Sequence, residues 1–293
     1  MAKLPVYGIS AFEEKQPKGF FYSNNLRLHL ESHKFVNEPH KHSTYIAVLF
    51  THGKGEHQID YTTYPVKPGS VFLLQPGQVH CWKLSKDVEG YVFFHTKEFY
   101  DSIFVSRQLH DFPFFFLDSN EPVIYCSKQE LDTVSLIFAE INEEHQAQLP
   151  LVKSKLGSLV DLLYINLSRY YLNNQDIHPA NSSAYLKVQK LQRLIDEHFR
   201  TEKLPKHYAD RMHMTTRHLG RLCQELLNKT TTELIAERLI IEAKRMLTHS
   251  DLTIAAVSEQ LGFEDYSYFI RFFKKHVGQS PKQFQQAEVN WHE

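Results

Sequence analysis

A helix-turn-helix pattern occurs twice in the last third of this 293-residue sequence, and it restricts the possible folds of that part strongly. In the second copy Thr253 can cap a short helix, and Gly262 supplies the positive φ with which a helix often ends. Asp265 can cap the next helix, and Ser280, followed by a proline, marks the start of a further one. Two short helices around a tight turn are typical of a helix-turn-helix.

The second helix of each copy separates into two faces at helical spacing. The predicted buried side chains are Leu219, Leu222, Cys223 and Leu226 in the first copy and Phe269, Phe272, Phe273 and His276 in the second. The predicted outer residues are Arg217, Gly220, Arg221 and Gln224 in the first copy and Ser267, Ile270, Arg271 and Lys274 in the second. A single charged helix face is usually only solvated, but the duplication of both faces favours a nucleic-acid surface.

These residues resemble the AraC/XylS family of bacterial transcription regulators. The pattern G-F-x-x-x-S-Y-F-x-R-x-F-K-K-x-x-G-x-S-P starts at Gly262, and the family's middle helix is visible at about Thr232–Thr248. The sequence departs from the family at His213, where the first turn usually has glycine, and at Gln285 or Gln286, in place of a terminal arginine. Histidine tolerates the left-handed region better than most residues, so we expect an intact first turn.

The resemblance implies double-stranded DNA as a partner and a role for each outer residue. The predicted DNA-binding residues are Arg217, Gly220, Arg221, Gln224, Tyr266, Ser267, Ile270, Arg271, Lys274 and Lys275. Arginines can contact guanine edges, the exposed isoleucine fits a thymine methyl group, and the lysines suit phosphates. A middle helix of roughly 25 Å is comparable to one DNA turn, so the two recognition helices can enter successive major grooves.

The first part of the chain, up to about Ile124, is predicted to be β structure. Strands are expected at Tyr45–Thr51, His57–Tyr61, Ser70–Leu74 and Tyr91–His95, with glycine and proline turns between them. Short strands at this spacing indicate a β-barrel or jelly roll. The histidines and the P-G-Q-V-H turn that ends at His80 resemble the cupin-like sensor domain of the same family.

Two helices and a linker are expected between the barrel and the DNA-binding part. Lys128–Gln148 and Leu151–Leu172 have apolar stripes. Either both helices simply pack on the barrel, or, as the family resemblance implies, they are a helical pair that also forms the dimer interface. The predicted domains are residues 1–172 for effector binding and dimerisation, 173–183 as a linker, and 184–293, all α-helical, for DNA binding. From Ala184 onward there are 17 Lys and Arg against 14 Asp and Glu, a net charge of +3, which leaves −4 on the preceding residues. This asymmetry favours a nucleic-acid partner for the second part.

Seven residues are predicted to bind a small-molecule effector in the barrel. They are His40, His42, His52, His80, Trp82, Glu89 and Tyr91, four of which lie near the effector-lining positions of the family's arabinose sensor. An aromatic platform with a few polar groups suits a small polar ligand such as a sugar. The alternative is that Trp82 and Tyr91 are simply core residues.

A second class of function is a metalloenzyme of the cupin type fused to a DNA anchor. Cupin enzymes place a glutamate shortly after a His-x-His pair, but Ser43-Thr44-Tyr45-Ile46 offers no carboxylate there. A facial metal site requires a carboxylate as its third ligand. We therefore predict no catalytic residue, no metal and no cofactor.

Composition and the family resemblance complete the expectations. We find no apolar run long enough to span a membrane and no signal-peptide pattern, and the three cysteines have no metal-ligand spacing. We therefore expect a cytoplasmic regulator that is not an enzyme. The resemblance implies a homodimer that acts on RNA polymerase at a promoter.

Overall fold

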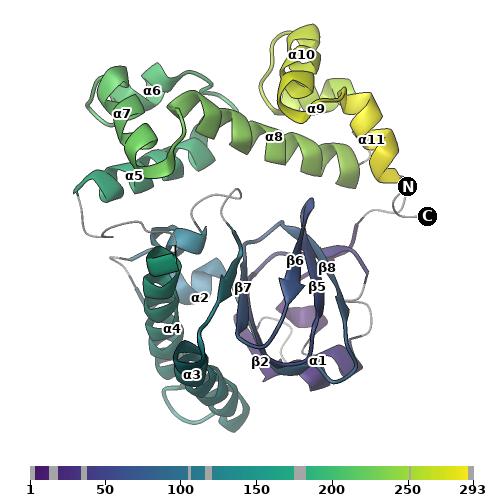
Figure 1. The fold of residues 1–293 in the computed structure, drawn as a ribbon, viewed down its shortest axis with the longest axis vertical. Helices are drawn as coiled ribbons and strands as arrows, with labels where there is room; N and C mark the ends of the chain where they lie inside the picture. The colour runs from purple at the N-terminus through teal and green to yellow at the C-terminus, as the bar shows by residue number, and fades with distance from the viewer. Residues whose placement is uncertain are drawn as a thin grey trace. The chain divides into compact units, whose positions relative to one another are not determined.

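The computed structural model describes residues 4–12, 19–33, 38–104, 107–115, 121–174, 183–250 and 252–289 (Figure 1). The chain divides into two compact units, one of residues 4–115 and 120–178 and one that contains residues 179–293. Most of the predicted linker, residues 173–183, lies outside the described residues. None of the described helices is long and apolar enough to cross a membrane.

Two five-stranded sheets form the first unit. The strands are β1 (Val6–Tyr7), β2 (Phe21–Asn25), β3 (His40–His42), β4 (Tyr45–His52), β5 (Gly55–Ile59), β6 (Thr62–Val66), β7 (Ser70–Leu74), β8 (Val79–Leu84), β9 (Glu89–His95) and β10 (Val123–Tyr125). Their orders are β1-β3-β8-β5-β6 and β10-β7-β4-β9-β2, and all pairs are antiparallel except β1 with β3. The predicted strands correspond to β4, β5, β7 and β9, and the predicted barrel-like fold is confirmed.

Alternation along the strands divides the apolar residues of this unit between two cores. In β4, Ile46, Val48 and Phe50 belong to a cluster shared by residues of both sheets, which we call the barrel interior. Ala47 and Leu49 point to the other face and belong to a second cluster, the helix-side core. Successive side chains of a strand point to opposite faces, so a single strand serves both cores.

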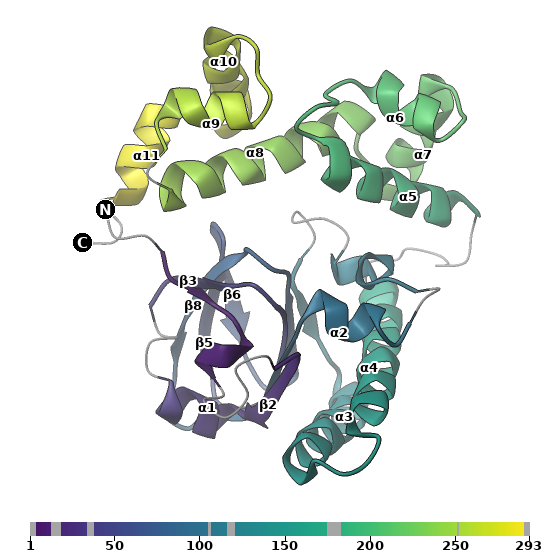
Figure 2. The same ribbon diagram turned by 180° about the vertical axis from the view of Figure 1, so that it is seen from behind.

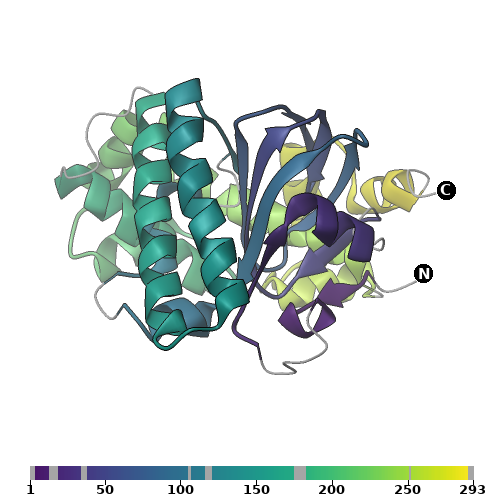
Figure 3. The same cartoon turned by 90° about the horizontal axis from the view of Figure 1, so that it is seen from below.

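Two long helices, α3 (Lys128–Ala147) and α4 (Val152–Asn174), cover the outer face of the second sheet and lie side by side (Figure 3). Ser127 starts α3 with a capping box in which Glu130 bonds back to the backbone of Ser127. The predicted apolar stripes of both helices, including Phe138 and Leu163, are buried or half-buried in the helix-side core. The prediction that these stripes pack on the barrel is therefore confirmed.

Several short helices complete the first unit, and the sequence analysis did not predict them. They are α1 (Leu26–Ser32), α2 (Lys97–Asp101) and 3-10 turns at Ile9–Ala11, Leu109–Asp111 and Pro113–Phe115. Each is three to seven residues long, too short for a clear helical periodicity.

The second unit is all α-helical, as predicted. Its helices are α5 (Ser183–His198), α6 (Pro205–Arg211), α7 (Thr216–Leu227), α8 (Thr231–His249), α9 (Ile254–Gln260), α10 (Tyr266–Val277) and α11 (Pro281–Val289). The 19 residues of α8 give it a length of about 28 Å. The pair α6–α7 packs near one end of α8 and the pair α9–α10 near the other (Figure 2).

Candidate DNA interface and sensor site

Both helix-turn-helix turns have the backbone that the sequence predicts. His213 in the first turn has φ 55° and Gly262 in the second has φ 69°. The side chain of Thr215 caps α7, and that of Asp265 caps α10. The same turn is therefore built once with a residue that tolerates the left-handed region and once with glycine.

The two recognition helices, α7 and α10, bury one face and expose the other. Leu219, Leu222, Cys223, Phe269 and Phe273 are buried, while Leu226 and Phe272 are half-buried. His276, which the sequence analysis placed on the buried side, is exposed, and its ring contacts the Phe272 ring at a centroid distance of 4.7 Å. His276 lies about one turn after Phe273, the last buried residue of α10, and close to the end of that helix, so the core no longer covers it.

The ten predicted DNA-binding residues all have solvent access. Eight are exposed, namely Arg217, Arg221, Gln224, Tyr266, Ser267, Arg271, Lys274 and Lys275. The other two, Gly220 and Ile270, are half-buried. A Cβ atom placed on Gly220 would meet no heavy atom within 4 Å, so this face of α7 is open.

The matched arginines of the two helices have intramolecular partners at the surface. Arg221 Nη2 donates a hydrogen bond to His218 Nδ1 at 3.2 Å. Arg221 Nη1 lies 3.6 Å from Glu225 Oε1, and Arg271 Nη2 lies 3.8 Å from Asp265 Oδ2. Both arginine side chains are more than 60% exposed, and exposed ion pairs stabilise by about 0–1 kcal/mol. Both guanidinium groups can therefore exchange these partners for a base edge or a phosphate.

A polar network that the sequence analysis missed holds α5 against α8. Arg238 Nε lies 2.8 Å from Asp196 Oδ1, and its Nη1 lies 2.9 Å from Glu242 Oε2. Arg200 Nη2 donates to Glu242 Oε1 at 2.7 Å. The network holds α8, the helix that joins the two motifs, in place against α5. Arg238 and Glu242 are four residues apart on α8, but each of the other two pairs joins residues 42 apart in sequence, a separation at which no local pattern indicates a pair.

The structure brings together four of the seven predicted effector-binding residues. His40, His42, His80 and Trp82 are buried in or beside the barrel interior. Tyr91 does not lie with them, because it packs against the helix-side core on the opposite face of β9. Trp82 and Tyr91 therefore do not form one platform.

His52 and Glu89 also lie away from this group. They face each other where β4 ends and β9 begins, beyond a register shift between Phe50 and His52. Both are exposed, and their partners are surface residues: His52 Nε2 lies 3.2 Å from Asp87, and Glu89 lies 3.1 Å from Arg27. The predicted strands, Tyr45–Thr51 and Tyr91–His95, stop short of both residues, and an alignment of short motifs does not show which face of a strand a residue occupies.

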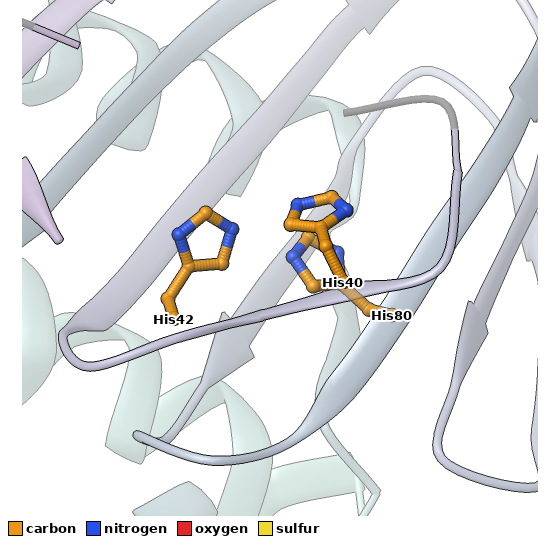
Figure 4. Close-up of side chains that lie close together, drawn as sticks. All are labelled: His40, His42 and His80. Carbon is orange, nitrogen blue, oxygen red and sulfur yellow. The ribbon is translucent and has the colours of Figure 1, made fainter. Parts of the chain in front are cut away.

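The three histidines form a compact buried group (Figure 4). His40 and His80 are cross-strand partners of β3 and β8, and His42 follows two residues later on the same face of β3. One ring nitrogen of each lies within 4.8 Å of those of the other two. His40 Nδ1 donates to the carbonyl oxygen of Glu38 at 2.7 Å, which fixes its tautomer and leaves Nε2 as an acceptor.

A fourth histidine, His57 of β5, extends the group. Its Nε2 lies 2.9 Å from His80 Nδ1, and both rings are fully buried. The sequence analysis included His57 only as part of a strand. Its alternation with the buried Ile59 was the available signal that the ring faces inward.

Burial keeps these imidazoles neutral. It lowers the pKa of His40, sets those of His42 and His80 well below 6.5, and lowers that of His57 to about 3. Neighbouring histidines add to the lowering, because a second positive charge in the same apolar space is unfavourable. The group therefore offers nitrogen lone pairs at neutral pH, not positive charge.

An open hollow lies elsewhere, at the edge of the first sheet. It has a volume of about 420 Å³ and is lined by Lys54, Gly55, Glu56, Val66, Lys83 and Ser85. None of the seven predicted effector-binding residues lines it. Its charges of both signs face water, unlike the aromatic and histidine lining of the barrel interior.

Two helix-turn-helix motifs joined by one helix, together with a separate two-sheet barrel, define a two-domain transcription regulator. An AraC-like ligand binding domain matches residues 26–148, and a helix-turn-helix domain matches residues 208–287. The chain belongs to the AraC/XylS family of transcription regulators, as the sequence motifs predict.

Similar proteins with curated descriptions span most of the chain. The arabinose operon regulatory protein of Salmonella typhimurium is 24% identical over 270 residues and covers 85% of this chain and 86% of its own. The HTH-type transcriptional regulator YfiF of Bacillus subtilis is 26% identical over 266 residues, with 84% and 77% covered. The activator RhaR of Escherichia coli K12 is 19% identical over 248 residues, with 84% and 86% covered.

Solved structures resemble the chain in part or over most of its length. The DNA-binding domain of AdpA, in complex with a target DNA, is 21% identical and covers 34% of this chain and 90% of its own, with a TM-score of 0.32. ToxT from Vibrio cholerae O395 is 13% identical and covers 91% and 97%, with a TM-score of 0.40.

Proposed function

We propose that this regulator binds a promoter through α7 and α10 and that a small molecule in the barrel interior controls this activity. The observation that carries the proposal is the pair of matched exposed faces on two recognition helices that pack near opposite ends of α8. A helix of about 28 Å is close to the 34 Å of one DNA turn, which suits successive major grooves on one side of the duplex.

Within each recognition helix the proposed roles follow from side-chain chemistry. Arg217, Arg221 and Arg271 read guanine edges, because a guanidinium can bind O6 and N7 together. Half-buried Ile270 suits a thymine methyl group. Lys274 and Lys275 neutralise phosphates near the end of α10.

For the effector we propose the barrel interior around Trp82, His40, His42 and His80. These side chains combine aromatic surface with imidazole nitrogens, which suits a small polar molecule. Because Tyr91, His52 and Glu89 lie outside this interior, we do not include them in the proposed site.

The proposed partners beyond DNA are RNA polymerase and a second copy of the chain. A promoter-bound regulator acts on transcription through the polymerase, and both are in the bacterial cytoplasm. For the homodimer we propose the exposed side of the α3–α4 hairpin, where Leu136 and Leu162 are 73% and 47% exposed. Exposed leucines on two neighbouring helices suit a symmetric partner.

The test separates the two proposed activities of the full chain. Selection from randomised duplexes yields a preferred site, and a thermal-shift screen of small polar molecules yields a stabilising ligand, because a ligand of the folded state raises its Tm. We expect Trp82→Ala to abolish the response to that ligand and to leave DNA binding without ligand unchanged. A Trp82→Ala protein that responds at the wild-type ligand concentration would refute the proposed pocket, and failure to select any sequence would refute the DNA-binding roles.

A further inference from the structure

The histidine group has a property that a ligand-free apolar core does not explain. His40 Nε2, His42 Nδ1 and His80 Nε2 are buried and have no hydrogen-bond partner among the described residues. Leaving a buried polar atom without a partner is unfavourable, and here three such atoms belong to neighbouring rings. A bound ion would use one ring nitrogen of each of these three histidines.

From this geometry we infer that His40, His42 and His80 hold a divalent first-row transition-metal ion, with Zn²⁺ as the best match. Zn²⁺ prefers imidazole nitrogens at about 2.0–2.1 Å in a tetrahedron, which places its ligand atoms roughly 3.3 Å apart. One ring nitrogen of each histidine already lies within 4.8 Å of those of the other two. Shifts below about 1 Å in each ring would close the site.

The surroundings of the three rings resemble the outer shell of a metal site. A ligating histidine usually donates its other N–H to a carbonyl oxygen or a similar group, which orients the ring. His40 does this with Glu38, and the second nitrogen of His80 is hydrogen-bonded to His57.

The absence of a carboxylate after the His-x-His pair argues against an iron site of the facial-triad type, but not against zinc. Three histidines and one open position form a complete zinc site. Neutral ligands leave the ion's charge of +2 uncompensated in the barrel interior, so the open position favours an anionic oxygen. For regulation, which rests on the proposed function, the effector would be a small molecule whose anionic oxygen completes the coordination.

The test uses the full chain, freed of metal with a chelator and then titrated with Zn²⁺ and, separately, with Co²⁺, whose visible spectrum reports its coordination. We expect one ion per chain, a higher Tm with Zn²⁺, and a tetrahedral Co²⁺ spectrum. Losing an outer-shell partner costs about 10–100-fold in metal affinity, so we expect that loss for His57→Phe and a larger one for His42→Asn or His80→Asn. The controls are His52→Asn, at an exposed histidine, and His95→Asn, at a buried histidine on the helix side of the sheet.

The outcomes distinguish this inference from the proposed function. A wild-type chain that binds no stoichiometric ion, or one that binds it equally well after His42→Asn and His80→Asn, overturns the metal site. Far-ultraviolet circular dichroism and DNA binding of the same variants show whether they are folded. If the variants are unfolded, stoichiometric ion binding by the wild-type chain alone decides whether the metal site exists. DNA binding without any ion would leave the proposed regulator intact, whereas loss of DNA binding in every form would refute that function and not the metal site.

Discussion

The side-chain amine of Lys203 donates a hydrogen bond of 2.6 Å to the carbonyl oxygen of Gly262, the residue at the turn of the second helix-turn-helix. The same amine donates to the carbonyl oxygen of Arg200 at 2.6 Å and lies 5.0 Å from the centre of the Phe263 ring. Lys203 lies between α5 and α6, so it joins the segment that leads into the first motif to the turn of the second. The two motifs are therefore linked directly as well as through α8.

Gly262 is predicted to be far less tolerant of a side chain than Gly278, although both have positive φ. A Cβ on Gly262 would lie 2.0 Å from the carbonyl oxygen of Arg200, whereas a Cβ on Gly278 would meet nothing within 4 Å. Gly278→Ala should cost about 1–2 kcal/mol from the left-handed backbone alone. Gly262→Ala should cost more, because the backbone around Arg200 must move. Hydrogen exchange of amides in α9 and α10 measures the loss of stability in both variants. Equal protection in the two variants would contradict the close approach of Gly262 to the carbonyl oxygen of Arg200.

The helix side of the first unit is predicted to lose stability in mild acid through His95. This buried ring accepts from the Tyr164 hydroxyl at 2.8 Å and donates to the carbonyl oxygen of Thr96, and burial lowers its pKa from 6.5 to about 4. Because the folded state binds the proton less well than the unfolded chain, the stabilisation is complete above about pH 6.5 and is lost as the pH falls towards 4. Between pH 7 and pH 5 we expect a loss of about 2 kcal/mol from this residue.

Denaturant unfolding at several pH values tests this prediction. His95→Asn should reduce by about one the number of protons taken up on unfolding in mild acid. Tyr164→Phe keeps the buried imidazole and should retain that proton uptake. An unchanged pH dependence in the His95→Asn protein would show that another group is responsible.

The dimer prediction can now be placed on particular residues. Leu136→Asp together with Leu162→Asp should give a folded monomer, because both side chains are exposed on the helices. Leu163→Asp is the matched comparison and should unfold the unit, because Leu163 is fully buried in the helix-side core. Sedimentation velocity measures the oligomeric state of each variant. A folded, unchanged dimer of the double variant would exclude this face as the interface.

Sequence reasoning succeeded where the structure depends on local contacts. Thr253, Asp265 and the Ser280–Pro281 pair begin helices as predicted, and His213 adopts the left-handed turn. Each of these features depends on residues within about one helical turn. The exposed recognition faces follow from the same short-range periodicity.

The barrel residues were harder to place because their positions depend on pairings between distant segments. The motif alignment put Trp82 and Tyr91 in one pocket, but a strand sends alternate residues to opposite faces, and a shift of one residue reverses the assignment. The pairing of His40 with His80 and the approach of His57 arise from strands that are 17 to 40 residues apart. A sequence pattern indicates such strands without fixing their register.

We propose that the matched arginines of α7 and α10 read the base sequence, and titration against a randomised operator at two or more salt concentrations tests this claim. Arg221→Ala and Arg271→Ala should each relax base preference at one position, by about 1–3 kcal/mol, in different parts of the site. Lys274→Ala, at an exposed residue on the same helix as Arg271, should retain the preference and lower the salt slope by about 1. Equal loss of affinity for every sequence in both arginine variants would contradict the claim.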